Sequence, residues 1–257
     1  MIPKKIHFTW FSNDPFPELV VQCIESWKKF LHGYEIIHWD SKKISSIDND
    51  FLKEALKKKK WAFAADFIRI YALYHEGGIY LDTDVEIYKS FDDLLSLKVF
   101  IGKENSFHVR RRKAVRFLTS HCMGAEKGHP FLKSCLEYYN RRHFILSEEE
   151  WLPEALKYDM TILPEIQFEM AKIHSYNPSE RHRRVQTIDH GVHIFPYDFF
   201  DCFKRTKNSY CRHLAMGGWR NENKNFNFSL KQRLKKTFFR FVSKVFGWFN
   251  LVAFRKL

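Results

Sequence analysis

Cysteine is scarce in this sequence, and no two cysteines stand close together. The five cysteines are widely spaced, their number is odd and no Cys-x-x-Cys pair occurs. This pattern argues against a disulfide framework and against a structural zinc site, and it favours reduced thiols in the cytosol. The chain also lacks internal repeats and low-complexity linkers.

Long hydrophobic runs are absent as well. No window holds about 18 uncharged apolar residues, the length that a membrane-spanning helix requires. The first ten residues contain no apolar stretch of the kind found in signal peptides. We therefore expect the protein to be made and kept in the cytosol.

Acidic residues are absent from the last part of the chain, since none follows Glu222. The formal net charge is +13, yet residues 223–257 alone contain nine Lys or Arg together with eight Phe. In the rest of the chain 34 basic residues face 30 acidic ones, so that part is nearly balanced. A basic, aromatic-rich chain suggests a polyanionic partner, either nucleic acid or an acidic membrane surface.

The basic segment has the periodicity of an amphipathic helix. From Leu230 onward apolar residues recur at steps of one, three or four, and most basic residues fall on the other side. Such a helix, with Phe and Trp248 on its apolar face, is typical of an in-plane membrane anchor. The alternative is a helix that packs on the body. We expect a domain over residues 1–225 and this helix over 226–257, peripheral on the inner face of the cytoplasmic membrane.

Strands alternate with helices over the first 90 residues, which predicts an α/β sheet of the nucleotide-binding kind. The patterns predict strands at residues 5–10, 34–39, 79–81, 85–88, 99–102 and 191–196, and helices at 18–31, 50–58, 61–74, 130–142 and 165–173.

Two carboxylates follow a short apolar run. Asp82 and Asp84 come directly after Ile79-Tyr80-Leu81. Residues i and i+2 of an extended chain point to the same side, so both can converge at the rim of the sheet, where open α/β sheets bind ligands. Carboxylates this close repel each other unless a cation lies between them. Mg²⁺ or Mn²⁺ suits such oxygen ligands and typically bridges phosphates.

A second acidic residue lies near an arginine on the preceding helix. Asp66 and Arg69 are three residues apart and share a face. A surface ion pair would contribute little, but this helix is otherwise rich in Ala, Phe and Ile. A buried acid and a buried Arg need partners, and a hydroxyl-rich anionic ligand would satisfy both.

Residues 61–86 resemble the DXD sugar-binding region of a family of retaining glycosyltransferases. This family includes the yeast initiating α-1,6-mannosyltransferase, the vertebrate α-1,4-galactosyl- and α-1,4-N-acetylglucosaminyltransferases and many bacterial capsule enzymes, and the large glucosylating toxins share its core. Four further segments resemble its motifs in order over about residues 1–220. They are Ile2 to Trp10, Tyr34 to Asp40, Lys127-Gly128-His129-Pro130 and His213 to Trp219.

The resemblance implies a GT-A fold, a single Rossmann-like mixed sheet flanked by helices. It also implies a nucleotide-sugar donor, Mn²⁺ or Mg²⁺ as cofactor, and retention of anomeric configuration by same-face attack. The implied catalytic residues are Asp82, Asp84, Asp66 and Arg69, and the implied metal ligands are Asp82, Asp84 and His213. The implied donor-binding residues are Thr9, Trp10 (stacked on the base), Asp66, Arg69, Gly78, Tyr80, Asp82, Gly218 and Trp219. Gly218 departs from the family, which often has Ser there, so a hydroxyl contact is lost.

The expected function is transfer of a hexose, with UDP-galactose, UDP-glucose or UDP-N-acetylglucosamine favoured as donor. The expected acceptor is a glycan, which a lipid-linked form would suit, in bacterial surface polysaccharide or lipopolysaccharide synthesis. Alternatives are a GDP-mannose-dependent enzyme and a toxin-like enzyme that glycosylates a protein. A nucleic-acid-binding protein and a phosphoryl hydrolase are disfavoured. The first leaves residues 77–84 unexplained, and the second needs more carboxylates.

Overall fold

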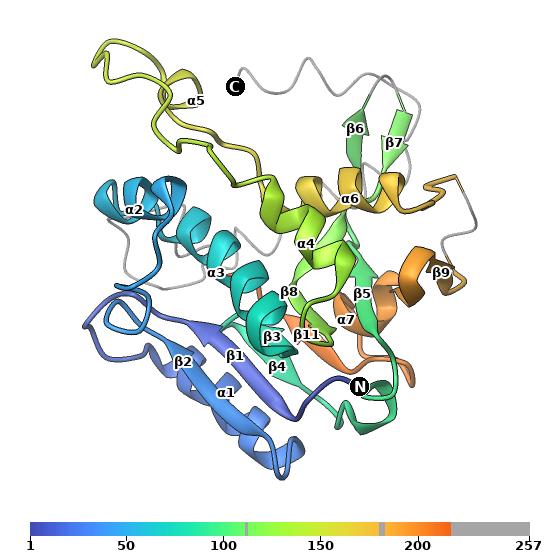
Figure 1. The fold of residues 1–257 in the computed structure, drawn as a ribbon. Helices are drawn as coiled ribbons and strands as arrows, with labels where there is room; N and C mark the ends of the chain where they lie inside the picture. The colour runs from blue at the N-terminus through green and yellow to red at the C-terminus, as the bar shows by residue number, and fades with distance from the viewer. Residues whose placement is uncertain (111–112, 180–182, 217–257) are drawn as a thin grey trace. The chain divides into compact units, whose positions relative to one another are not determined.

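A seven-stranded mixed sheet forms the centre of the protein (Figure 1). The structure is a computed structural model that describes residues 1–110, 113–179 and 183–216. The strand order is β2-β1-β3-β8-β5-β10-β9. Its strands are β1 (Lys5–Thr9), β2 (Glu35–Trp39), β3 (Gly78–Leu81), β5 (Val99–Lys103), β8 (Leu118–Ala125), β9 (Gln186–Ile188) and β10 (Val192–Phe195).

Helices cover both faces of this sheet, and two short ribbons are added to it. The ribbons are β4 (Val85–Ile87) with β11 (Cys211–His213) and β6 (His108–Arg110) with β7 (Lys113–Val115). The helices are α1 (Glu18–Phe30), α2 (Asp50–Lys57), α3 (Trp61–Glu76), α4 (Pro130–Glu137), α5 (Glu154–Lys157), α6 (Leu163–Ile173) and α7 (Tyr197–Phe200), with 3-10 turns η1 (Asp92–Leu94) and η2 (Asp189–Gly191).

The register brings several strand ends to one edge of the sheet. β1 runs parallel to both β2 and β3, with Thr9 opposite Trp39 and His7 opposite Tyr80. β8 runs antiparallel to β3 and to β5, with Leu81 opposite Cys122. The carboxyl ends of β1 and β3 therefore lie side by side, and the end of β3 meets the middle of β8. Ligands of open α/β sheets bind at such an edge.

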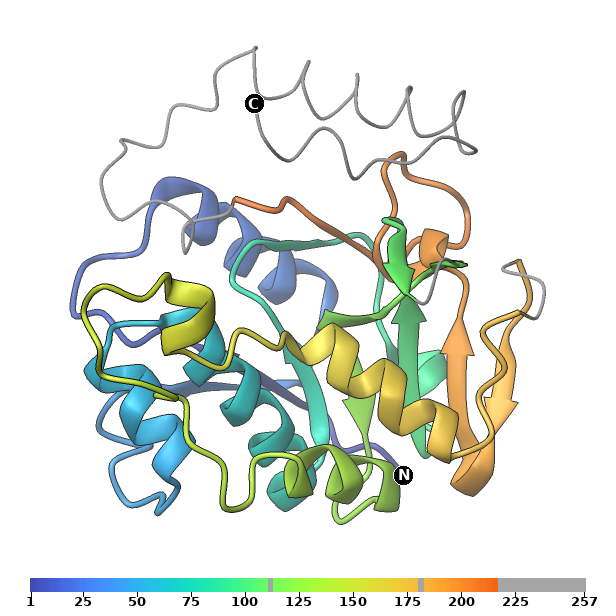
Figure 2. The same cartoon turned by 90° about the horizontal axis from the view of Figure 1, so that it is seen from above.

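Each face of the sheet has its own hydrophobic core. One core is built mainly from α2, α3, α4 and α6, whereas the other contains Trp27 of α1, both inward residues of β4 and Phe200 of α7. Figure 2 shows α1 on the opposite side of the sheet from α3, α4 and α6. This two-sided burial explains why every residue of β3 and β5 is buried.

Helix α3 carries two of the predicted site residues into the interior. Eight of its residues are buried, because it packs between the sheet and helices α2 and α4. It ends at Gly77, whose φ of 68° lies in the left-handed region that glycine adopts without strain. The chain then turns directly into β3, which brings the end of that strand back beside the middle of the helix.

The single mixed sheet flanked by helices is the fold that the sequence predicted. Every strand and helix predicted within residues 1–216 is confirmed in position, except that the helix expected over 130–142 ends at Glu137. A left-handed residue, Arg141 with φ of 59°, follows it. The central strand β8 and strands β6, β7 and β9 were not predicted. The helix expected over 226–257 lies outside the described residues.

No helix among the described residues is both long and apolar enough to cross a membrane.

Candidate active site

Asp82 lies just past the end of β3 and is fixed at both its backbone and its side chain. Its backbone N–H donates to the His121 carbonyl at 2.9 Å, which extends the β3–β8 pairing by one residue. Its carboxylate accepts a hydrogen bond from the Arg69 guanidinium at 2.6 Å. The side chain is therefore held at the rim of the sheet, as the sequence predicted.

Asp84 ends the turn into β4 and is held by the segment that follows β11. Its backbone carbonyl accepts from the Leu214 N–H and its Oδ2 from the Met216 N–H, both at 2.9 Å. Its Oδ1 lies 3.2 Å from Nε2 of His213. Burial would raise the pKa of Asp84, but the charge and hydrogen bond of His213 lower that pKa to about 2.

His213 completes a three-residue set with the two carboxylates. One ligand atom each from Asp82, Asp84 and His213 lies within 4.8 Å of the others. Burial opposes the charged imidazole, yet Asp84 raises the pKa of His213 to about 9. In the absence of a metal the histidine proton thus balances the carboxylate. Two carboxylate oxygens and an imidazole nitrogen are a donor set that fits Mn²⁺.

Arg69 is buried and joins two acids. Its side chain is 5% exposed, and its two terminal nitrogens lie 3.2 Å from Asp66 Oδ1 and 2.6 Å from Asp82 Oδ1. The guanidinium also stacks over the Tyr80 ring, 4.6 Å from its centroid. Burial is the largest influence and disfavours the charge, but Asp82, Tyr80 and Asp66 together outweigh it and raise the pKa of Arg69. Among the described residues its Nε has no hydrogen-bond partner.

Asp66 links helix α3 to the start of helix α6. Its Oδ2 accepts from the backbone N–H of Leu163 at 3.0 Å, while its Oδ1 pairs with Arg69. Burial raises the pKa of Asp66 to about 6, although Arg69 and the Leu163 N–H act in the opposite direction. The predicted pair Asp66 and Arg69 is thus largely buried and forms an ion pair, and Asp82 joins it into a triad.

The remaining predicted donor residues lie at different depths. Thr9 and Tyr80 share a hydrogen bond of 2.8 Å at the ends of β1 and β3, with the Tyr80 ring fully buried behind Arg69. Trp10 is partly exposed beside them, and its ring meets that of Phe16 edge-on at 5.3 Å.

Gly78 is not brought to the carboxylates. It begins β3, at the opposite end of the strand from Asp82, and a Cβ there would lie 2.8 Å from the Lys5 carbonyl and 3.0 Å from His7 Nε2. Close packing against β1 explains this glycine. Gly218 and Trp219 lie outside the described residues.

Two residues beside the site were not anticipated from the sequence. His121 of β8 and Asp201, which follows α7, form with His213 a second set whose ligand atoms lie within 4.8 Å of one another. Their positions in the chain, 80 residues apart, give no local pattern. The one feature of the sequence that could have pointed to this site is the histidine within Thr-Ser-His-Cys, a stretch that resembles a loop.

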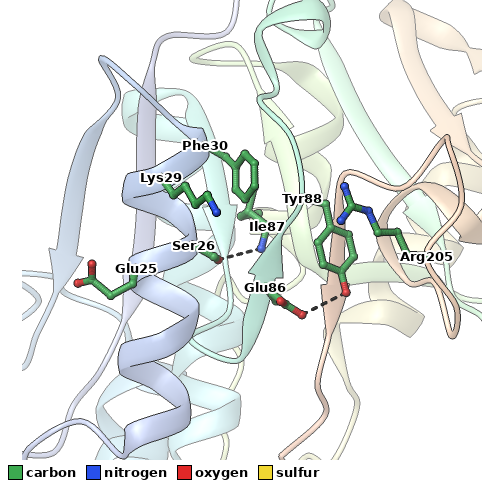
Figure 3. A pocket seen from close by; sticks show the side chains of 8 residues that line it. All are labelled: Glu25, Ser26, Lys29, Phe30, Glu86, Ile87, Tyr88 and Arg205. Carbon is green, nitrogen blue, oxygen red and sulfur yellow. Dashed lines mark hydrogen bonds between the residues drawn. The ribbon is translucent and has the colours of Figure 1, made fainter.

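A surface pocket of about 380 Å³ lies between α1 and β4, and neither Asp82 nor Asp84 lines it (Figure 3). Ser26 accepts the Ile87 N–H at 2.9 Å, and the Tyr88 hydroxyl donates to Glu86 at 3.1 Å. The Arg205 guanidinium lies over the Tyr88 ring, 4.7 Å from its centroid. The hydrogen bond between Ser26 and Ile87 thus joins α1 to β4 beside this pocket.

Comparison with known proteins places the chain beside glycosyltransferases. Residues 17–101 match the family model described as a glycosyltransferase sugar-binding region containing the DXD motif. Inositol phosphoceramide mannosyltransferase 3 of Schizosaccharomyces pombe is 32% identical over 51% of this chain and 35% of its own length. Mannosyl phosphorylinositol ceramide synthase SUR1 of Saccharomyces cerevisiae is 31% identical over 56% of this chain and 37% of its own.

The chain therefore spans less than half the length of these curated relatives. Among solved structures, the PaToxG glycosyltransferase is 18% identical, with a TM-score of 0.44 over 67% of this chain and 69% of its own.

Proposed function

Because the chain belongs to the family of glycosyltransferases whose sugar-binding region contains the DXD motif, we propose that it transfers a sugar from a nucleotide-sugar donor to a glycan or glycolipid acceptor. The observation that carries this proposal is the convergence of Asp82, Asp84 and His213 at the carboxyl edge of the sheet, with Arg69 behind them. Such an edge is where open α/β sheets bind nucleotides.

The three converging side chains would hold Mn²⁺ or Mg²⁺. A divalent ion there supplies Lewis-acid stabilisation of the diphosphate leaving group. The protein supplies the geometry: Arg69 pairs with both Asp82 and Asp66, and the backbone N–H of Met216 orients Asp84. Because these groups are already oriented before the reaction, no free energy is needed to reorganise them when charge develops on the leaving group.

The donor is a nucleoside-diphosphate hexose. From the sequence alone UDP-hexoses were favoured, whereas two of the relatives are named as enzymes that handle mannosyl groups. That naming supports GDP-mannose as a second candidate. The partly exposed Trp10 would stack on either base. We propose retention of configuration by same-face attack, with the diphosphate accepting the acceptor proton.

The acceptor carries a hydroxyl on a glycan, and the names of the relatives favour one attached to a lipid. An acceptor at a membrane would agree with the basic segment over residues 226–257 and with a peripheral location on the inner face of the cytoplasmic membrane. Bacterial polysaccharides and proteins are the other acceptor classes to compare.

Calorimetry with Mn²⁺ and each nucleotide tests the proposal. We expect UDP or GDP to bind only when Mn²⁺ is present, and Asp84→Asn to abolish this binding. Asp48→Asn is the matched control, because Asp48 is an exposed carboxylate paired with Lys53. A screen for donor hydrolysis with UDP-hexoses and GDP-mannose then identifies the sugar. Absence of nucleotide binding, together with an unchanged Asp84→Asn variant, would refute the proposal.

A further inference from the structure

His213 has a second neighbour besides Asp84. The ring of His121 stacks on the ring of His213, with centroids 4.4 Å apart and an angle of 13° between the planes. His121 is buried in β8, and its carbonyl is the group that accepts the Asp82 backbone N–H. One residue thus contacts Asp82 through its backbone and His213 through its side chain.

The orientation of the His121 ring is fixed from the other side. Its Nε2 lies 3.0 Å from the Phe200 carbonyl, which can only accept, so Nε2 carries the proton. The same carbonyl also accepts from the Cys211 thiol. The ring is therefore held flat against His213 by a backbone group of helix α7, and it leaves Nδ1 without a proton when the imidazole is neutral.

Asp201 follows helix α7 and faces both imidazoles. Its Oδ2 accepts the Asn105 N–H at 2.7 Å, which locks the side chain. One of its oxygens lies within 4.8 Å of ring nitrogens of both His121 and His213. Asp201 is consequently a second carboxylate near the His213 imidazole, besides Asp84.

A second metal ion is a poor explanation of this group. A metal lies close to the plane of each imidazole that binds it, about 2 Å from the nitrogen. One ion cannot lie in the planes of two nearly parallel rings whose centroids are 4.4 Å apart. The stacked arrangement instead matches an outer layer that orients a ligand, as carboxylate–histidine pairs do around metals in general.

We propose that His121 and Asp201 are positioning residues that hold the His213 imidazole in the orientation required for metal binding. This inference rests on the proposed function, since it assigns the two residues to the same metal site. The stacked His121 ring prevents His213 from tilting, and the Asp201 carboxylate stabilises the imidazole while Nε2 faces Asp84.

The test measures Mn²⁺ affinity of the full chain from the electron paramagnetic resonance signal of free Mn²⁺. We expect His121→Ala and Asp201→Asn each to weaken Mn²⁺ binding roughly 10- to 100-fold, as loss of such outer groups does. His121→Phe keeps a flat ring on His213 and should restore affinity to within about threefold of the original chain. A residue needed only for folding would not give this rescue.

Two control variants remove the same kinds of side chain, a stacked histidine and a carboxylate, from positions outside the proposed metal site. His108→Ala removes another stacked histidine, 4.1 Å from the Phe117 ring, and Asp189→Asn removes a carboxylate that accepts from Ser175. Both should leave Mn²⁺ affinity unchanged. If the folded His121→Ala and Asp201→Asn variants bind Mn²⁺ with the affinity of the unmodified chain, this inference is overturned but the proposed function is not. If His121→Ala does not fold, the near-isosteric Asp201→Asn decides. Failure of the unmodified chain to bind Mn²⁺ would overturn the proposed function as well.

Discussion

At the scale of single residues, Arg69 is a buried cation that pairs with Asp66 and Asp82, whose side chains are 13% and 25% exposed. Removing one partner from a buried charged group leaves the others unpaired, which costs about 3–5 kcal/mol. We expect Arg69→Met to lower the free energy of unfolding by that amount in urea titrations. Arg142→Met is the control, because Arg142 pairs with Asp159 at 3.8 Å with its side chain 49% exposed. That variant should lower the free energy of unfolding by less than about 1 kcal/mol. Equal losses of stability in both variants would contradict the role of Arg69.

The ion pair of His213 and Asp84 predicts how metal affinity depends on pH. In the metal-free protein the pKa of His213 is raised to about 9, so the imidazole is protonated at neutral pH. A metal must displace that proton, and a ligand that must lose a proton binds more weakly as pH falls below its pKa. We therefore expect Mn²⁺ affinity to rise about tenfold per pH unit from 7 to 9 and then to level off. An affinity that is constant over this range would contradict the assignment of His213 as a ligand.

The residues of the site differ in how far sequence could identify them. Asp66, Arg69, Asp82 and Asp84 fall within 19 positions and belong to one helix–turn–strand pattern, so spacing alone brings them together. His121 lies on a strand that the sequence pattern does not predict. The orientation of its ring depends on a hydrogen bond to the carbonyl of Phe200. Contacts between residues so far apart in the chain form only in the folded protein, and no local sequence pattern predicts them.

At the scale of elements, the start of β3 requires glycine for packing. Gly78 has φ of 107°, and an added Cβ would meet the Lys5 carbonyl at 2.8 Å. We expect Gly78→Ala to destabilise the protein by about 2 kcal/mol or more, since it adds both strain and overlap. Gly33→Ala is the control: φ is 75° but nothing lies within 4 Å, so strain of about 1 kcal/mol remains.

The Gly78→Ala variant also shows whether Gly78 serves packing or donor binding. Because Gly78 lies at the far end of β3 from Asp82, the folded fraction of Gly78→Ala should bind Mn²⁺ and nucleotide with unchanged affinity. Calorimetry on the folded variant checks this. A large loss of nucleotide affinity without a loss of stability would return Gly78 to the donor site that the sequence suggested.

Strand β8 marks the limit of sequence-based prediction at this scale. Its first half contains Thr119, Ser120 and His121, which resemble a loop more than the centre of a sheet. Thr119 is nevertheless buried because its hydroxyl accepts from the Gly102 N–H and donates to the Cys122 carbonyl. Polar residues are tolerated there only because distant strands supply partners. Strands β1, β3, β5 and β10 were predicted because each has an apolar or alternating pattern within its own residues, although the buried His7 of β1 also has partners in Gly77 and Trp39.

At the scale of the whole molecule, the positive charge divides between two regions of the chain. The body is nearly neutral, and nine of the 43 basic residues fall within residues 223–257, where no acid occurs. Each basic residue near an anionic bilayer contributes about 1 kcal/mol. If the segment is a membrane anchor, charge reversal within it should weaken binding far more than the same change in the body.

Matched charge reversals in the full chain test this. We expect Lys231→Glu, Lys235→Glu and Lys236→Glu together to reduce sedimentation with phosphatidylserine vesicles on the order of 100-fold in affinity. The control reverses Lys57, Lys58 and Lys59, which are exposed at the end of α2 and change the net charge equally. Equal losses in both variants would mean that net charge alone attracts the protein to the surface. Unchanged sedimentation of the first variant would rule out the anchor.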